Sequence, residues 1–177
     1  MSQHGRPSAD SFMSDLWTPS SGSDSFAMLN ESSTDSDTSY IVATITSGTS
    51  LSSIPAVKLS ACTDPGVDTG FVTQYYVRKE SGTNWTATLA LYQGDPNSGG
   101  TLLDSWTALI TTTSYTLRMR SHSDPVCASI TDFSNLYVGL SGTSTGSSVV
   151  RATYVDLILP DAPSSALHRR TLVGGGL

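Results

Sequence analysis

Apolar side chains recur at every second position in at least five segments of the middle of the chain. This period of two is typical of a β-strand with one buried and one solvated face. By this period Trp85 and Tyr75 point into the core. Tyr76, Tyr92 and Tyr137 fall on the opposite faces of their strands, where half-exposed tyrosines are expected. The segments that alternate are 41–45, 71–78, 84–91, 115–120 and 136–140.

The longest apolar run, 149–159, does not separate into two faces. Such a run predicts a strand that is buried on both sides, or one that contains a bulge. Weaker strands are expected near 26–29, 56–61 and 102–110. The short connection at 79–84 suits a β-hairpin. About nine strands without a convincing helix predict an all-β fold, a jelly-roll-like sandwich of two antiparallel sheets.

The periodic patterns divide the chain into one domain and two extended arms. Residues 1–38 are polar and acidic, and predict an N-terminal arm with a first edge strand. Residues 39–160 hold the sandwich. Residues 161–177 predict a C-terminal arm, which contains three consecutive glycines. At 177 residues the chain is long enough for a single domain with a core.

Composition supports strands and argues against several classes of function. Hydroxyl side chains supply most of the polarity, with 31 Ser and 23 Thr against a charged fraction of 14%. The net charge of -6 argues against a nucleic-acid partner, which requires a basic face. The N-terminal residues lack the apolar region of a signal peptide, and no apolar run is long enough to span a bilayer. We therefore expect a soluble protein with no nucleic-acid or membrane partner.

No motif for catalysis, a cofactor or a metal ion stands out. The histidines are far apart and show no zinc-binding spacing, and His122 is expected to be a solvated loop histidine. Cys62 and Cys127 are expected to be free thiols, with one disulfide as the alternative. Asp35 and Asp37 fit a solvated acidic loop better than a calcium site. We predict that the protein is not an enzyme and has no catalytic, cofactor-binding or metal-binding residues.

Several stretches of the sequence resemble small β-sandwich virion proteins of tailed phages. They are Trp17-Thr18-Pro19, Leu29-Asn30-Glu31 with 35–41, and 131–138 with 151–157. The resemblance covers roughly residues 17–160 and assigns no specific family. It implies a structural component of a phage particle, a capsid decoration (cement) protein first and a neck or tail component as the alternative. It also implies a virion location, other virion proteins as partners, and a homo-oligomer, by analogy a trimer.

The two arms carry the residues that we expect to bind neighbouring virion subunits. Isolated hydrophobic side chains in a polar background gain about 1.5–3 kcal/mol each when a partner buries them. Glycines in the C-terminal arm permit a close approach of the backbone. The expected partner-binding residues are Phe12, Leu16, Trp17, Arg169, Arg170, Leu172 and Leu177.

A jelly-roll carbohydrate-binding module is the alternative from another class of function. Aromatic side chains could stack on a sugar ring if three of them lay flat on one sheet face. An enzyme that degrades polysaccharides comes third, because the sequence shows no convergent set of acid and base residues. The aromatic residues considered for stacking are Trp17, Trp85, Trp106, Tyr75, Tyr76, Tyr92 and Tyr137.

Overall fold

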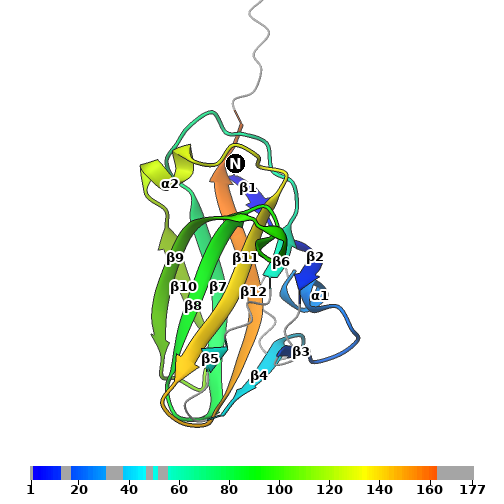
Figure 1. The fold of residues 1–177 in the computed structure, drawn as a ribbon, viewed down its shortest axis with the longest axis vertical. Coiled ribbons are helices and arrows are strands. Elements are labelled where there is room, and N and C mark those ends of the chain that lie inside the picture. Colours follow the sequence, from blue (N-terminus) through cyan, green and yellow to red (C-terminus); the bar gives the residue numbers. More distant parts are fainter. Residues whose placement is uncertain (1, 13–16, 31–37, 47–49, 52–55, 163–177) are drawn as a thin grey trace, which may run out of the picture.

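The computed structural model describes residues 2–12, 17–30, 38–46, 50–51 and 56–162 of the chain. In these residues the strands form two antiparallel sheets of six strands each, which pack face to face as a sandwich (Figure 1). This architecture confirms the all-β, jelly-roll-like fold that the alternation predicts.

Sheet A has the strand order β10-β7-β12-β4-β3, with β1 also paired to β12. The central strand β12 pairs with β4 along its first half and with β1 along its last residues. Its register is irregular at two places, and most of its residues are buried on both faces. Both features predicted for the run 149–159 are therefore present. The strands of sheet A are β1 (Ser2–Gly5), β3 (Trp17–Pro19), β4 (Ile41–Ile45), β7 (Val72–Gly82), β10 (Thr116–Ser121) and β12 (Ser148–Pro160).

Sheet B has the order β2-β6-β11-β8-β9, with β5 also paired to β11. The short 3-10 helix η1 (Pro96–Ser98) connects β8 to β9, and helix α2 (Asp124–Ala128) follows β10. The strands of sheet B are β2 (Pro7–Phe12), β5 (Ser50–Leu51), β6 (Ala56–Leu59), β8 (Trp85–Gln93), β9 (Thr101–Ile110) and β11 (Leu136–Ser144). The weaker strands expected near 56–61 and 102–110 thus correspond to β6 and β9.

The inner faces of the two sheets enclose one hydrophobic core. Trp85 and Tyr75 are buried in it, which confirms the side on which the alternation places them. Gly142 of β11 lies against Trp85 so closely that a Cβ atom there would be 2.2 Å from the indole Nε1. The absence of a side chain at Gly142 therefore lets the indole fill the space next to β11.

The first thirty residues, where the structure describes them, belong to the sandwich. β1 lies beside β12 and β2 beside β6, so the chain crosses from sheet A to sheet B between Gly5 and Pro7. Trp17 in β3 is buried, and its ring centroid lies 6.2 Å from that of Trp85. The described part of 1–38 thus differs from an extended arm, because strand pairing and core packing hold it against distant parts of the chain, but it does contain the edge strands β2 and β3.

Residues near 26–29, expected to be a strand, form the short helix α1 (Ser25–Leu29) instead. The carboxylate of Asp10 in β2 accepts hydrogen bonds from the backbone N–H groups of Ser25 (2.8 Å) and Phe26 (2.7 Å). The start of a helix leaves such N–H groups without a partner within the helix. A side chain from another element therefore caps α1, and this contact is not encoded in the local apolar pattern.

The connection at 79–84 is not the hairpin that its length suggests. β7 belongs to sheet A and β8 to sheet B, so the chain passes from one sheet to the other here. Gly82 adopts a left-handed conformation with φ of +84°, and the N–H of Thr83 donates to the carbonyl of Ser147. These contacts with the neighbouring turn direct the chain across the sandwich rather than back along β7.

Candidate functional site

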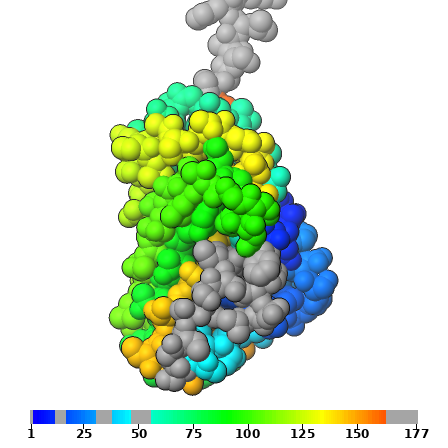
Figure 2. Space-filling view, viewed as in Figure 1, coloured from blue at the N-terminus to red at the C-terminus, as the bar shows by residue number. Residues whose placement is uncertain are grey.

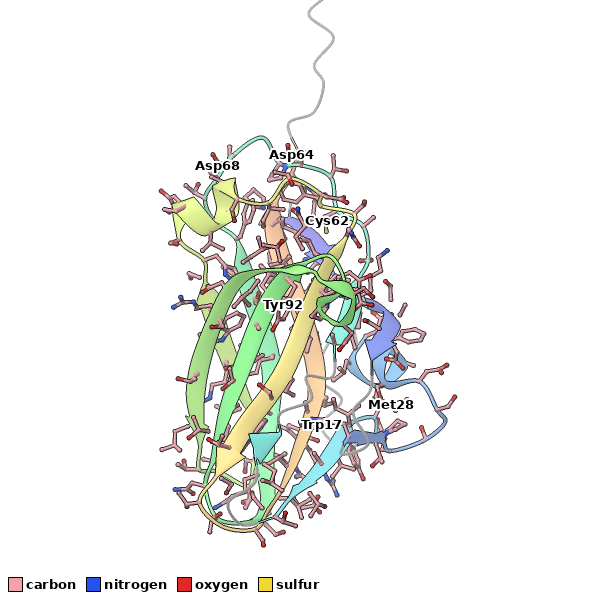
Figure 3. The ribbon with its side chains drawn as sticks, in the orientation of Figure 1. Trp17, Met28, Cys62, Asp64, Asp68 and Tyr92 are labelled. Atoms are coloured by element: carbon pink, nitrogen blue, oxygen red, sulfur yellow. The ribbon has the colours of Figure 1, made fainter. Side chains whose placement is uncertain are left out.

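Two tyrosines lie side by side on the outer face of sheet B. Tyr92 in β8 and Tyr137 in β11 are directly paired in register, and with Ala90 they form a cluster separate from the core. They are only 9% and 8% exposed, so the half-exposed tyrosines expected here are largely buried. Burial raises the pKa of both phenols, and the charge of Asp95 raises that of Tyr137 further. Figure 3 labels Tyr92 where β8 approaches η1.

The tyrosine pair belongs to a row of side chains that crosses four strands. Leu102 of β9 is paired with Tyr92, and Lys58 of β6 is paired with Tyr137. Leu102 is 52% exposed, and Lys58 is half-buried. Because neighbouring strands lie about 4.8 Å apart, the row spans about 14 Å across the sheet. It therefore combines aliphatic, aromatic and cationic groups along one line, which we call the sheet B row.

Small and hydroxyl side chains adjoin the sheet B row on the same outer face. Ala56, Ala90 and Gly139 are aligned across three strands next to the tyrosines, and all three are buried. Hydroxyl groups follow along the strands beyond these residues. They come from Thr86, Thr88, Ser105, Thr107, Ser141 and Thr143. Figure 2 presents the side of the molecule on which β8, η1 and β9 lie, coloured green.

A chain of hydroxyl, imidazole and carboxylate groups lies between β7 and β9. Nε2 of His122 is 2.8 Å from Oγ1 of Thr73, and its Nδ1 is 2.9 Å from Oδ2 of Asp104. Arg120 donates to the same carboxylate. This order of groups is that of a catalytic relay. However, Thr73 and the side chain of His122 are 0% exposed, so a substrate has no access to the hydroxyl, and we interpret the group as a structural polar seam.

The expectation of a solvated His122 is therefore wrong. The residue directly follows β10, and its backbone N–H donates to the carbonyl of Phe71, which brings it inside the sandwich. Burial lowers the pKa of its imidazole despite the opposing effect of Asp104. Burial also opposes the ionisation of Asp104, but the hydrogen bonds from Arg120 and His122 outweigh it and lower the pKa of this carboxyl.

A second buried carboxylate lies on the outer face of sheet A. Oδ2 of Asp156 lies 2.6 Å from Nδ1 of His4 and accepts a hydrogen bond from the Tyr154 hydroxyl at 2.9 Å. Burial and the charge of Asp156 raise the pKa of the Tyr154 phenol. The ring of Tyr154 packs edge-on against that of Tyr76, with centroids 6.1 Å apart. This cluster links β1 to β12 and places two more tyrosines side by side, on the opposite side of the sandwich from Tyr92.

The structure does not bring the seven expected partner-binding residues together in the part that it describes. Trp17 lies in the protein's own core, which corrects the expectation that a partner subunit buries it. The alternation could not reveal this, because β3 has only three residues. The others lie outside the described part: the side chain of Phe12, and the residues Leu16, Arg169, Arg170, Leu172 and Leu177.

Cys62 and Cys127 are free thiols, as expected. Burial raises the pKa of both, which favours the protonated form. Figure 3 shows Cys62 near the same end of the sandwich as Asp64. Among the described residues, no group of three His, Cys, Asp or Glu side chains is placed to hold a metal ion. Asp35 and Asp37, considered for calcium, lie outside those residues.

No protein-family model matches the sequence, and no curated protein matches it. Several solved structures resemble it in fold, among them three that are each 14% identical to this chain. The CBM22-1 xylan-binding domain of Paenibacillus barcinonensis Xyn10C has a TM-score of 0.48 and covers 92% of this chain and 94% of its own. A family 11 carbohydrate-binding module from Clostridium thermocellum, in complex with a beta-1,3-1,4-mixed-linked tetrasaccharide, has a TM-score of 0.37 and covers 89% and 97%. The family 11 module of the Clostridium thermocellum cellulase Lic26A-Cel5E has a TM-score of 0.35 and covers 88% and 94%.

No helix in the described residues is both long and apolar enough to cross a membrane. The solved structures are too distant from this chain to indicate its function. The function is therefore argued from the surface of the chain itself.

Proposed function

We propose that the protein binds a neutral polysaccharide chain through the outer face of sheet B. The observation that carries this proposal is the direct pairing of Tyr92 and Tyr137 within the sheet B row. Both residues point away from the core. Their burial therefore does not contribute to the packing between the two sheets.

The chemistry of the sheet B row suits a sugar ring. A pyranose has an apolar C–H face and a rim of hydroxyl groups, so it is recognised by aromatic and aliphatic surface with a few polar groups around it. Leu102, which is 52% exposed, supplies most of the accessible apolar surface, and Tyr92 and Tyr137, which are 9% and 8% exposed, adjoin it. The Lys58 ammonium and the phenol hydroxyls supply donors for sugar oxygens. The length of the row, about 14 Å by strand spacing, favours several linked sugars over a single one.

The charge of the two outer faces favours sheet B as the neutral-sugar site. Around Tyr92 and Tyr137 the paired side chains are mostly alanine, glycine, serine and threonine, and the charged groups near them, Lys58 and Asp95, are of opposite sign. The outer face of sheet A carries partly exposed ionic groups near its tyrosines, among them Arg151 and Glu80. A neutral ligand gains nothing from desolvating such groups.

Substitution of Leu102 tests the proposal with little risk to folding, because this side chain is exposed. We expect Leu102→Ser to weaken binding of a neutral polysaccharide about fivefold, since contact with one aliphatic side chain is lost. Tyr92→Phe should weaken it by a similar factor through loss of the hydroxyl. The measurement is affinity electrophoresis against a panel of neutral α- and β-linked glucans, xylans and mannans.

Met119→Ser is the matched control, because Met119 is 58% exposed on an edge strand of sheet A. It should bind the same polysaccharide as the unsubstituted protein does. Absence of binding to every member of the panel would overturn the proposal. Equal losses in Leu102→Ser and Met119→Ser would also overturn it, because binding would then not depend on the sheet B row.

The structural role in a phage particle stays a prediction. Of the residues that motivated it, Trp17 lies in the core and the others lie outside the described part of the chain. The virion partners, the homo-oligomer and the virion location depend on the same resemblance and stay predictions with it. The absence of enzymatic activity likewise remains a prediction.

A further inference from the structure

Ser2 and His4 lie on the same face of β1, beside the end of β12 (Figure 1). Residues two apart in a strand point to the same side of the sheet. Oγ of Ser2 lies 3.3 Å from Nε2 of His4, and Nδ1 of His4 lies 2.6 Å from Oδ2 of Asp156. A hydroxyl, an imidazole and a carboxylate are therefore linked in the order of a serine hydrolase triad.

This group differs in accessibility from the polar seam around His122, which shows the same order of groups. In the seam the hydroxyl and the imidazole are both buried. On β1, Ser2 is exposed and the side chain of His4 is 39% exposed, whereas the carboxylate of Asp156 is fully buried. A reagent in solution can therefore reach the hydroxyl, while the carboxylate is shielded from water.

The buried carboxylate holds the imidazole in the orientation that a general base needs. With Oδ2 of Asp156 as the acceptor, Nδ1 of His4 carries the proton, and Nε2 is left as an acceptor towards Ser2. The hydroxyl of Tyr154 donates to the same Oδ2 at 2.9 Å, so the carboxylate is itself held in place. The distance of 3.3 Å between Oγ and Nε2 is typical of a catalytic hydrogen bond before substrate binds, when such bonds are long.

Apolar side chains adjoin the imidazole on the same outer face of sheet A. Ile158 of β12 is paired with His4 of β1, and Val72 of β7 is paired with Ile158. Pro160 is paired with Ser2. All three apolar side chains are half-buried, so part of each is accessible. This surface suits an aliphatic acyl group whose carbonyl carbon lies next to the Ser2 hydroxyl.

We propose that Ser2, His4 and Asp156 form a nucleophilic site that hydrolyses carboxylic esters with a short aliphatic acyl group. Oγ of Ser2 attacks the carbonyl carbon and forms a bond to it, while the hydroxyl proton passes to Nε2 of His4. The bond between the acyl group and the leaving alcohol then breaks, and this alcohol takes the proton from His4. Water attacks the acylated Ser2 with the same base and releases the carboxylic acid. This activity goes beyond the proposed sugar binding, because it lies on the other sheet and consumes only ester and water.

The sequence does not reveal this site, because Asp156 is 152 positions away from His4. The pairing of β1 with β12 brings the two residues together. Ser2 lies on a strand and not at a turn from strand to helix, so it shows no Gly-x-Ser-x-Gly motif. The contacts supply an activated nucleophile, and general-base activation of this kind raises a rate by about 10²–10⁴-fold.

Covalent labelling and ester hydrolysis by the full chain test this site. The probes are a fluorophosphonate, which reacts irreversibly with activated serine hydroxyls, and 4-nitrophenyl butyrate. We expect peptide mass spectrometry to locate the fluorophosphonate adduct on Ser2. We also expect an initial burst of 4-nitrophenol as the acylated Ser2 forms. Ser2→Ala should abolish the burst and lower the rate of hydrolysis about 100-fold.

His4→Asn separates the role of His4 as a base from its structural contact. The asparagine amide can still donate to Asp156 in place of Nδ1, but it takes no proton from Ser2. The loss should be similar in Ser2→Ala and His4→Asn and no larger in the double variant, because the two residues act as a unit. Ser8→Ala is the matched control, since Ser8 is exposed like Ser2 but its hydroxyl donates to the carbonyl of Lys58. It should react as the unsubstituted protein does, and thermal unfolding verifies that each variant is folded.

Three outcomes would refute the site. The first is the absence of an adduct on Ser2. The second is hydrolysis by Ser2→Ala as fast as by the unsubstituted protein, because the His4 imidazole would then act as the nucleophile itself. The third is an adduct on Ser2 that forms equally fast in His4→Asn, since Ser2 would then be an ordinary exposed hydroxyl. The expected result would show that the prediction of no enzymatic activity is wrong.

Discussion

Gly142, a position without room for a side chain, allows β8 and β11 to pack closely around the core. At Gly142 an added Cβ would also lie 2.4 Å from the backbone carbonyl oxygen of Thr86, as well as against the Trp85 indole. Neither group is the flexible end of a side chain, so the strain cannot be relieved by a rotamer change. A methyl group here would therefore have to displace the largest side chain of the core.

We expect Gly142→Ala to lower the free energy of unfolding by about 3 kcal/mol or more, because it overpacks a rigid contact. Gly99→Ala is the control. Its Cβ would meet nothing within 4 Å, although its φ of +88° makes a side chain strained. That strain should lower the free energy of unfolding by about 1–2 kcal/mol. Urea denaturation followed by tryptophan fluorescence measures both, and equal losses would contradict the role of the Trp85 contact.

At the scale of elements, β1 shows how a short strand is held by one side chain as well as by its backbone. Its four residues pair with the end of β12, and His4 reaches the fully buried carboxylate of Asp156. The other donor to this carboxylate is Tyr154. A buried carboxylate that loses a donor is strongly disfavoured. His4 therefore contributes to the attachment of the whole strand.

We expect His4→Ala to lower the free energy of unfolding by about 1.5–3 kcal/mol, which is the range for hydrogen bonds to charged groups. Hydrogen exchange should also become faster in the amides of β1 than in those of β8. Ser2→Ala is the control, because the Ser2 hydroxyl lies 3.3 Å from Nε2 of His4 at an exposed position. It should change stability by less than about 0.5 kcal/mol. Unchanged exchange in β1 of His4→Ala would show that backbone pairing alone holds the strand.

Elements whose burial depends only on their own residues could be predicted from the sequence. The alternation in 84–91 and 136–140 predicts β8 and β11, and it also places Tyr92 and Tyr137 on the outer face. Their direct pairing could not be predicted, because it depends on the register between two strands 40 residues or more apart. Helix α1 could not be predicted for a similar reason, since its cap is a side chain of β2.

At the scale of the whole molecule, the sandwich separates two kinds of surface. The outer face of sheet B is rich in hydroxyl groups, whereas that of sheet A carries paired arginines and a buried carboxylate. The polar seam of His122 and Asp104 lies between the sheets, where it connects β7, β9 and the end of β10. Aromatic packing supports it, because the Trp106 ring lies edge-on to the His122 imidazole at 5.5 Å.

The seam makes the stability of the whole fold dependent on pH. Burial lowers the pKa of His122 below its usual 6.5, so the unfolded chain binds a proton there before the folded protein does. The contribution of neutral His122 to stability is therefore fully present above about pH 6.5. It is lost as the pH falls from 6.5 to the lower pKa that His122 has in the folded protein. A second loss of stability follows below about pH 3.8, the usual pKa of this carboxyl. The pKa of Asp104 is lower in the folded protein, so the unfolded chain binds the proton first.

We expect the urea midpoint to fall between pH 7 and pH 5.5, and to fall less in His122→Asn. An asparagine amide can donate to Asp104 as Nδ1 of His122 does, but it does not titrate in this range. The variant is less stable at pH 7, because it lacks a group to reach Oγ1 of Thr73. The measured quantity is thus the slope of stability against pH and not its absolute value. A slope in His122→Asn equal to that of the unsubstituted protein would assign the pH dependence to groups outside the seam.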